Sequence, residues 1–368
     1  MNILIFGTAS NTRSPDQQGQ AELFLQLNHK VFLLTLGKDD VLHRNFRALG
    51  AEAYSSVHKT GRSVFFFIRQ AIYFARFCRK HKIDVAFCHL QGNALIGGMA
   101  KYFIKTRIVY VRHHTDEYKV MGGAKDLWIG KMANRLSPRI IAISEKVKEE
   151  LLKDGVKPEK IFRINLCYNF EEFLKTDVKE DPVVIRDKFS SPFVLLCIAR
   201  LFKTKRQLIA FEAVRLVTEM GLECTLVCIG TGEMQEELQQ WINDNNMQHK
   251  INIIGFRPNV ADYIEAVDML IQPSESEASN QVVKEAGILK KPAIMCHSVG
   301  DFDDYIVDKK NGFLMNKENP LPEMVSLLSE LITDKERVKK AGEAIHDTII
   351  NTFGIDNAKE KYMALLKN

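Results

Sequence analysis

One stretch decides how this chain folds: Gln272-Pro273-Ser274-Glu275-Ser276-Glu277-Ala278-Ser279-Asn280-Gln281-Val282-Val283-Lys284-Glu285-Ala286. It follows an apolar run, Val267 to Ile271, that is typical of a buried strand. Ser279 and Asn280 are favoured N-cap residues, so a helix is expected to begin there and to run to about Leu289. Ligands of open α/β sheets bind where strands end and helices begin, and the N–H groups of a helix N-terminus suit a phosphate or an oxyanion. The stretch therefore predicts a ligand-binding loop.

Two carboxylates bracket this loop, Glu277 before the expected helix and Glu285 inside it. Lys284 is the local cation that we expect to balance them. Taken alone, the pair is typical of a loop acid and a solvated helix residue. The position between a buried strand and a helix N-terminus favours a functional interpretation instead.

A second strand leads into a basic segment. The apolar run from Phe193 to Ile198 is followed by Ala199-Arg200-Leu201-Phe202-Lys203-Thr204-Lys205. A helix opened by these residues would place Arg200 and Lys205 over its N-terminus, where a diphosphate is the natural ligand. The alternative is an ordinary basic patch on the surface.

The N-terminal half alternates between apolar runs and amphipathic stretches, which predicts a parallel sheet covered on both faces. The expected strands are Ile3–Gly7, Val31–Thr35, Val85–His89, Ile108–Arg112 and Ile140–Ile143. The expected helices are Gln20–Leu27, Ser63–Lys80, Ala94–Phe103 and Lys125–Arg135. Gly7-Thr8-Ala9-Ser10 stands after the first strand in place of a GxGxxG sequence, so dinucleotide binding is not expected.

Two histidines end one of these strands, His113 and His114, with Asp116 beside them. Catalytic groups cluster at strand ends in such sheets, which favours a functional role for one of the histidines. The alternative is a surface pair, or a histidine that only hydrogen-bonds its loop. A metal site would require further ligands.

The motifs, taken in order, resemble those of the retaining glycosyltransferases of family 4, which have the GT-B fold. Pro-Ser-x-x-Glu, seven residues and Glu-Ala stand at 273–286, with Glu277-Ala278-Ser279-Asn280 where the family usually has Glu-Gly-Phe-Gly. The segment 199–205 resembles Gly-Arg-Leu-x-x-x-Lys, with alanine in place of the glycine. Ile254-Gly255-Phe256 resembles the strand end near the nucleobase.

This resemblance implies an α/β fold of two doubly wound parallel-sheet domains that face each other across a cleft. Residues 1–180 would form the acceptor-side domain and residues 190–350 the nucleotide-sugar domain, and a helix within 351–368 would cross back to the first. The polar, charged stretch Lys175–Ser191 is the expected linker.

The resemblance also implies the site. Arg200 and Lys205 would neutralise the leaving diphosphate, Glu277 would contact the donor sugar near the reacting carbon, and Glu285 would bind the ribose hydroxyls. His113, with His114 as the alternative, would face the donor sugar. The remaining residues implied in donor binding are Gly230, Phe256, Ala278, Ser279, Asn280 and Val282. The donor would be a nucleotide-diphosphate sugar, and the acceptor a glycan or a lipid-linked precursor. No cofactor, metal or nucleic-acid partner is expected, and Asp301-Phe302-Asp303 is interpreted as a loop acid cluster before a helix.

Length and composition agree with a globular protein of two domains, since 368 residues are too many for one ordinary hydrophobic core and 46% of them are hydrophobic. Neither a signal peptide nor an apolar run of membrane-spanning length is visible, so a cytoplasmic location is expected. The seven cysteines are scattered and are expected to be reduced.

Charge is unevenly shared between the two halves. Residues 1–180 carry 29 Lys and Arg against 18 Asp and Glu, a net +11, and residues 181–368 carry 22 against 28, a net −6. The stretch Ser63–Lys80 is aromatic, apolar and basic, with Arg69, Arg76 and Lys80 near one helical face. It is either a buried sheet-covering helix with a solvated basic stripe or an interfacial helix that docks on an anionic membrane. Both interpretations can hold together.

Two other functions stay open, since a fold does not fix function. The same fold hosts nucleotide-sugar epimerases, which need no acceptor. A two-domain sugar-binding protein without catalysis is the second alternative, which the paired Arg200 and Lys205 disfavour.

Overall fold

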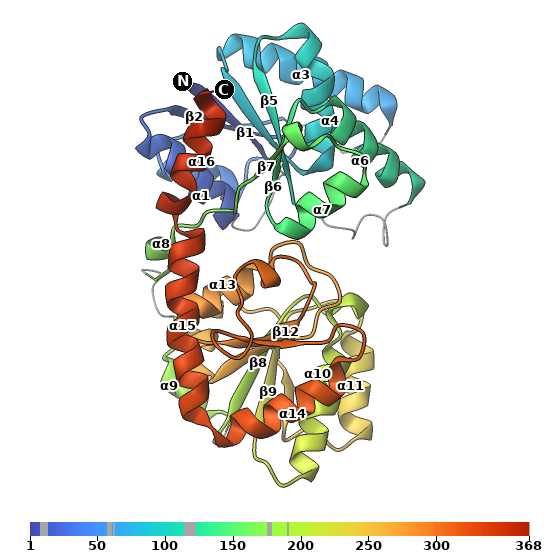
Figure 1. Ribbon diagram of the computed structural model, residues 1–368, viewed down its shortest axis with the longest axis vertical. Coiled ribbons are helices and arrows are strands. Elements are labelled where there is room, and N and C mark those ends of the chain that lie inside the picture. Colours follow the sequence, from blue (N-terminus) through green and yellow to red (C-terminus); the bar gives the residue numbers. More distant parts are fainter. Residues whose placement is uncertain are drawn as a thin grey trace. The chain divides into compact units, whose positions relative to one another are not determined.

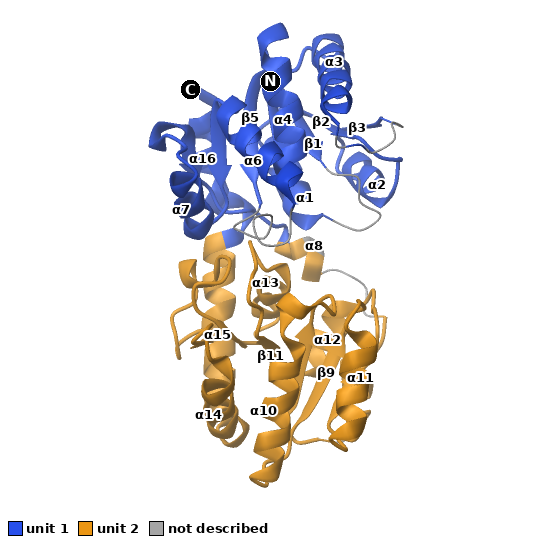
Figure 2. Ribbon diagram, turned by 90° about the vertical axis from the view of Figure 1, so that its right-hand side faces the viewer, with its two compact units in different colours: residues 1–169, 353–368 blue, residues 170–352 orange. Residues whose placement is uncertain are grey.

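The computed structural model describes residues 1–7, 14–56, 61, 63–113, 123–174, 179–189 and 191–367. These form two compact units, one of residues 1–169 with 353–368 and the other of residues 170–352 (Figure 2). Each unit is built on a parallel sheet with helices on its faces (Figure 1). The predicted α/β class with two parallel sheets is confirmed.

The first unit has a seven-stranded sheet in the order β3-β2-β1-β4-β5-β6-β7. Its strands are β1 (Asn2–Gly7), β2 (Lys30–Thr35), β3 (Glu52–Ser55), β4 (Val85–His89), β5 (Arg107–Arg112), β6 (Arg139–Ala142) and β7 (Ile161–Arg163). Its helices are α1 (Pro15–Gln26), α2 (Val41–Ala48), α3 (Val64–Lys80), α4 (Leu90–Ala100), α6 (Ala124–Leu136), α7 (Glu145–Lys153) and α16 (Ile355–Lys367), with short turns η1 (Lys101–Phe103) and η2 (Pro158–Lys160). The strand order reverses between β1 and β4, which makes the sheet doubly wound.

All five strands predicted in this unit are present within a residue at each end. They were recognisable because strands buried on both faces read as continuous apolar runs, as in β1 and β2. The two edge strands, β3 and β7, were missed, since they are short and their residues are only half-buried. Helix α1 contacts α2 and α16, and helix α4 contacts α3 and α6, which gives two groups of packed helices.

The last helix, α16, belongs to the first unit although it ends the chain. It packs on α1, and its Tyr362 ring lies edge-on to Phe24 at 5.4 Å between centroids. The backbone N–H of Tyr168 donates to the carbonyl of Phe353 just before α16. These contacts bring residues far apart in the sequence beside the strands that carry His89 and His113.

The second unit has a six-stranded sheet in the order β10-β9-β8-β11-β12-β13. Its strands are β8 (Val194–Ile198), β9 (Thr225–Ile229), β10 (Ile251–Ile253), β11 (Met269–Gln272), β12 (Ala293–Cys296) and β13 (Phe313–Met315). Its helices are α8 (Phe170–Leu174), α9 (Pro182–Asp187), α10 (Gln207–Glu219), α11 (Gln235–Asp244), α12 (Val260–Ala266), α13 (Gln281–Ile288), α14 (Pro320–Thr333) and α15 (Lys335–Phe353), with turns η3 (Lys203–Lys205) and η4 (Phe302–Asp304). Its order reverses between β8 and β11.

Part of the expected linker is ordered structure. Asp181 caps α9 by accepting from the N–H of Val183, and Ile185 of this helix is buried. Helix α9 packs on α12 in the second unit. The stretch looked structureless because a helix of six residues is too short to show a period.

All seven cysteines are free and buried, as expected of reduced core residues. Among the described residues, no helix is long and apolar enough to cross a bilayer.

Candidate functional site

The predicted donor-binding residues gather at one edge of the second sheet. Arg200 follows β8, Gly230 follows β9, Phe256 follows β10 and Glu277 follows β11. These four strands are neighbours and run parallel, so their carboxyl ends lie along the same edge. A doubly wound sheet binds its ligand at such an edge, next to the point where the strand order reverses.

The loop after β11 is shaped by Asn280. Its side-chain oxygen accepts from the N–H of Val283 at 3.0 Å, so Asn280 is the N-cap of α13, as predicted. Its amide nitrogen lies 3.1 Å from Oε1 of Glu277 and donates to it. The backbone of Asn280 is extended, with φ −76°, so this position needs no glycine. One side chain therefore caps the helix and orients the loop carboxylate.

Glu277 is paired with Lys205. Lys205 Nζ donates to Oε1 of Glu277 at 2.8 Å, and both side chains are 12% exposed. A second cation from the same segment, Arg206, pairs with Glu275 at 3.1 Å. Lys284 was predicted to balance the loop carboxylates, and it does act on Glu277 through charge. The direct ion pair of Glu277, however, is with Lys205, 72 positions away in sequence.

Lys284 is instead buried against Asp301. Its Nζ donates to Oδ2 of Asp301 at 2.7 Å and to Oγ of Ser279 at 2.9 Å, and both charged side chains are 1% exposed. Ser279 donates to the same carboxylate oxygen at 2.7 Å. Asp301 lies in a loop directly before η4, as predicted, but its side chain is buried beneath the loop of residues 273–280.

Gly300 allows this packing. Its φ is +60°, and a Cβ added there would lie 2.9 Å from Cβ of Glu277. Only glycine adopts this left-handed conformation while approaching the loop so closely. The segment 298–301 thus supports the backbone of Glu277 directly.

Arg200 is exposed, and its guanidinium stacks on the ring of Phe202 at 4.6 Å. The helix that this segment was expected to open begins later, at Gln207. Turn η3 and the left-handed Arg206, with φ 52°, intervene, and Gln207 donates to the carbonyl of Arg200 at 3.0 Å. The two cations therefore sit on a tight turn before α10 rather than on its first turn.

The other donor-binding candidates differ in character. Gly230 is required by packing, since a Cβ there would lie 2.0 Å from the carbonyl oxygen of Ala199. The ring of Phe256 is 65% exposed and free to contact a ligand face. Glu285 accepts from Nε2 of Gln281 at 2.5 Å, one turn earlier in α13. Ala278 and Val282 are half-buried in the loop and the first turn of the helix.

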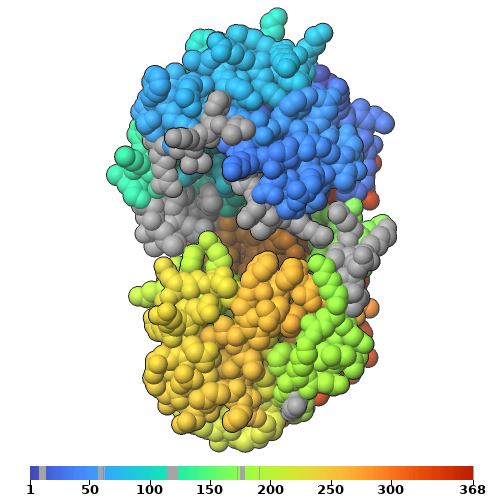
Figure 3. Space-filling view, turned by 180° about the vertical axis from the view of Figure 1, so that it is seen from behind, coloured from blue at the N-terminus to red at the C-terminus, as the bar shows by residue number. Residues whose placement is uncertain are grey.

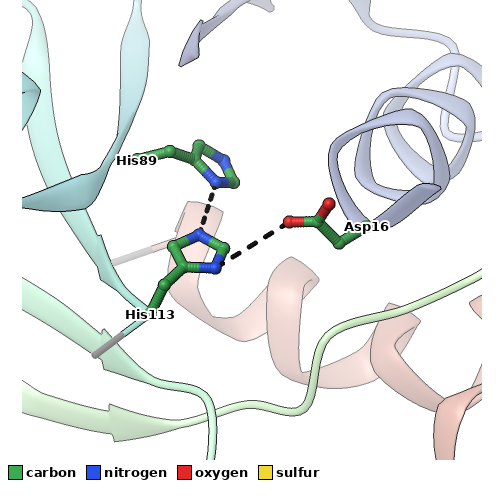
Figure 4. A group of neighbouring side chains, drawn as sticks. All are labelled: Asp16, His89 and His113. Carbon is green, nitrogen blue, oxygen red and sulfur yellow. Dashed lines mark hydrogen bonds and ion pairs between the residues drawn. The ribbon is translucent and has the colours of Figure 1, made fainter. Parts of the chain in front are cut away.

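His113 lies in the first unit, directly after β5, and is not a surface residue (Figure 4). Its Nε2 is 2.8 Å from Nδ1 of His89, which ends the neighbouring strand β4. Its Nδ1 is 3.9 Å from the carboxylate of Asp16 on α1. The alternative candidate, His114, lies outside the described residues. His89 and Asp16 were missed, although His89 ends a predicted strand and so stood at the catalytic edge.

Burial governs the charge of both histidines. It lowers the pKa of His89 well below the usual value, and the neighbouring His113 lowers it further. Burial also lowers the pKa of His113, against the pull of Asp16. Two adjacent rings are thereby kept neutral near pH 7. Ligand atoms of Asp16, His89 and His113 lie within 4.8 Å of one another, so the cluster has the residue types of a cation site as well.

Matches to two families together span most of the chain. Residues 180–347 match "Glycosyl transferases group 1", and residues 20–172 match "Glycosyltransferase Family 4". The chain belongs to glycosyltransferase family 4. It is a retaining glycosyltransferase that uses a nucleotide sugar, and the predicted resemblance is confirmed.

Individual relatives are distant. The UDP-Gal:alpha-D-GlcNAc-diphosphoundecaprenol alpha-1,3-galactosyltransferase of Escherichia coli is 24% identical over 79% of this glycosyltransferase and 78% of the relative. The N-acetylgalactosamine-N,N'-diacetylbacillosaminyl-diphospho-undecaprenol 4-alpha-N-acetylgalactosaminyltransferase of Campylobacter jejuni is 26% identical over 73% and 72%. The crystal structure of HepE from Anabaena with UDP-glucose matches with a TM-score of 0.82 at 17% identity, over 100% of this chain and 99% of that one. The predicted GT-B fold is confirmed.

Proposed function

We propose that this glycosyltransferase moves a hexose-type unit from a UDP-sugar to a lipid-linked or cell-surface glycan precursor. The named relatives from Escherichia coli and Campylobacter jejuni act on diphosphoundecaprenol-linked acceptors, and HepE was crystallised with UDP-glucose. These names support uracil as the nucleobase of the donor and a carrier lipid on the acceptor.

The observation that carries the proposal is the Lys205–Glu277 ion pair beside the capped N-terminus of α13. Cleavage of the donor's anomeric bond places negative charge on the leaving diphosphate. Lys205, the exposed Arg200 and the N-terminal dipole of α13 are then the groups that stabilise it electrostatically. Glu277 contacts the donor sugar, and Glu285 accepts from the ribose hydroxyls.

Phe256 and His113 are the remaining proposed contacts to the donor. The exposed ring of Phe256 offers a face for the uracil base. His113 contacts a hydroxyl of the donor sugar. A lipid-linked acceptor also requires contact with a membrane surface, for which α3 offers exposed basic and apolar side chains.

The test is a matrix of UDP-sugars against a soluble glycan and a short-chain polyprenyl-diphosphate-linked sugar, with products identified by mass spectrometry. We expect one donor to give a product on the lipid-linked acceptor, with the anomeric configuration retained by NMR. Thermal stabilisation by each UDP-sugar ranks the donors beforehand. Conversion of a UDP-sugar to its epimer without acceptor, or binding with no turnover on either acceptor, would contradict the proposal.

A further inference from the structure

The hydrogen bond between His113 and His89 continues into the core of the first unit. Nε2 of His89 is 2.9 Å from Oε1 of Gln20 on α1, and Nε2 of Gln20 donates to the hydroxyl of Tyr362 on α16 at 2.9 Å. Gln20, His89 and Tyr362 are at most 2% exposed. Four residues from four separate elements thus form one buried chain that ends at His113.

With the Gln20 amide oriented as in the structure, the donors and acceptors of this chain define where its protons lie. Oε1 of Gln20 can only accept, so Nε2 of His89 must carry the hydrogen and donate it. Nδ1 of neutral His89 is then a bare acceptor, and the facing Nε2 of His113 must donate to it. The remaining nitrogen of neutral His113, Nδ1, is bare. It has no hydrogen-bond partner among the described residues, with Asp16 3.9 Å away.

We propose that Gln20, His89 and Tyr362 are positioning residues that hold the proton of His113 on Nε2 and present its bare Nδ1 as an acceptor for a sugar hydroxyl. This inference rests on the proposed function, in which His113 contacts the donor sugar. It adds the direction of that contact: the substrate hydroxyl donates and the ring accepts. Tyr362 ends the chain, because its hydroxyl accepts from Nε2 of Gln20 and holds that side chain between α1 and α16.

Protonation of His113 at Nδ1 would remove the hydrogen-bond acceptor that the ring offers to the sugar hydroxyl. The groups that face it are Asp16, which favours the cation, and His89, which is itself neutral. At the other end of the chain, Tyr362 interacts electrostatically with Asp16 and the buried Cys167, and Cys167 interacts with Glu22. Burial is the largest effect and lowers the pKa of His113 below 6.5, so the acceptor form persists to the acid side of that value.

The alternative proton order runs the other way. If the Gln20 amide turned over, its nitrogen would donate to His89, both histidines would carry the hydrogen on Nδ1, and His113 would donate rather than accept. The two orders predict opposite tautomers, and both can be read in the free enzyme.

The first experiment measures the tautomers directly. The full-length enzyme is labelled with nitrogen-15 at histidine, and long-range proton–nitrogen correlations are recorded without substrate, with His89→Gln and His113→Gln for assignment. We expect both rings to be protonated on Nε2. Protonation of both on Nδ1 overturns the proposal, whether or not transfer activity is found, which separates it from the proposed function.

The second experiment uses Gln20. A carboxylate can only accept, so Gln20→Glu keeps the proton order while its charge moves the acid limb of kcat toward higher pH. Gln20→Leu and Tyr362→Phe each remove a hydrogen bond of the chain, so the proton of His113 is no longer held on Nε2. We expect kcat to fall about three- to tenfold, the effect of one lost hydrogen bond, with KM for the UDP-sugar nearly unchanged. Tyr54→Phe, which removes a hydroxyl bonded to Glu52 on the edge strand β3, is the matched control.

Gln20→Glu is the decisive variant because the two orders predict opposite results for it. Activity of Gln20→Glu well above that of Gln20→Leu supports the assigned order. Activity at or below that of Gln20→Leu, in protein whose melting temperature is unchanged, overturns it. If Gln20→Leu fails to fold, the tautomers of the labelled wild type still decide the question.

Discussion

Lys205 and Glu277 form an ion pair with 2.8 Å between Nζ and Oε1, so the cation assigned to the diphosphate is held by the carboxylate assigned to the sugar. The contact joins the turn after β8 to the loop after β11. In the donor complex Lys205 must share its charge between Glu277 and the diphosphate. The pair therefore sets the position of Lys205 before the substrate arrives.

Removing either phosphate-side cation should slow the reaction. We expect Arg200→Ala and Lys205→Ala each to lower catalysis at least tenfold, since a charge-assisted contact to a developing anion contributes about 1.5–3 kcal/mol. Lys205→Ala should cost more, because it also leaves half-buried Glu277 without its cation. The effects of Lys205→Ala and Glu277→Gln should be non-additive. Lys203→Ala, an exposed lysine of the same turn, is the control. Near-normal turnover in both single variants would refute the phosphate role.

The two loop carboxylates should separate binding from turnover. Glu285→Ala is expected to weaken UDP binding by about tenfold, the effect of losing hydrogen bonds from ribose to a charged group. Glu277→Ala is expected to leave UDP affinity within about threefold and to lower kcat. Isothermal calorimetry with UDP and steady-state kinetics measure the two effects. Glu275→Ala, in the same loop but paired with Arg206, is the control. Wild-type UDP affinity in Glu285→Ala would show that the ribose assignment is wrong.

Activity should survive the removal of divalent cations. In the proposed reaction, Arg200, Lys205 and the N-terminus of α13 supply the positive charge that stabilises the leaving group. Asp301, the first acid of the Asp-Phe-Asp sequence, is committed to Lys284. We expect at least half of the activity to remain in EDTA, followed in a time course with and without added magnesium. Complete loss that magnesium restores would contradict this expectation.

Sequence reasoning could name the candidate residues of the second unit because they follow strand ends in local motifs. Asn280 as N-cap, Glu277 in the loop and Arg200 after β8 could all be named from local pattern alone. The pairing of Lys205 with Glu277 could not, because it depends on β8 and β11 being neighbours, which only strand order determines.

The site in the first unit shows the same limit more strongly. His113 was marked by its strand end, but its partners come from α1, β4 and α16, and no periodicity or spacing links Gln20 to Tyr362 across 342 positions. Lys284 was misjudged for a related reason. It was expected to balance the carboxylates of its own segment, whereas the carboxylate that permits its burial, Asp301, lies on a different loop.

The Lys284–Asp301 pair should be critical for the stability of the second unit. Lys284→Met leaves a buried carboxylate without its cation, which costs about 3–5 kcal/mol. Lys284→Met/Asp301→Asn removes both charges and should recover much of the loss. The chain has two tryptophans, so Trp128→Phe leaves Trp241, which packs on Phe211 of α10, as the reporter of this unit in urea. Lys310→Met, at an exposed lysine, is the control. A double variant no more stable than Lys284→Met would contradict the explanation.

The structure of helix α3 is compatible with both interpretations of its sequence, a sheet-covering helix and an interfacial helix. Its buried face includes Phe67, Phe74 and Phe77, which pack in the first unit and are not available to a membrane. Its outer face keeps Phe65, Ile68 and Ile72 exposed, at 76%, 43% and 49%. Arg69, Arg76 and Lys80 are exposed as well, and at 100° per residue they form a stripe next to the apolar one. The light-blue segment that contains α3 lies at the surface of the first unit in Figure 3.

We therefore expect reversible, salt-sensitive binding to anionic membranes through α3. Each Lys or Arg near an anionic surface contributes about 1 kcal/mol, so three or four suffice for weak attachment, and the exposed apolar stripe adds burial. The test is co-sedimentation with vesicles of phosphatidylcholine, with and without phosphatidylglycerol. Reversing Arg69, Arg76 and Lys80 to Glu should abolish binding. Reversing Lys310, Lys339 and Lys340, which are exposed on the second unit, changes the net charge equally and should not.

Salt separates the two contributions to this binding. Attachment through charge should fade as the Debye length shortens from about 10 Å at 0.1 M to about 3 Å at 1 M, whereas burial of Phe65, Ile68 and Ile72 should not. Phe65→Ser should therefore weaken the residual binding at high salt and leave the salt dependence itself in place. Equal binding to neutral vesicles, or equal loss in both charge-reversed variants, would contradict docking through α3. The excess positive charge of the N-terminal half would then be left for a soluble anionic acceptor.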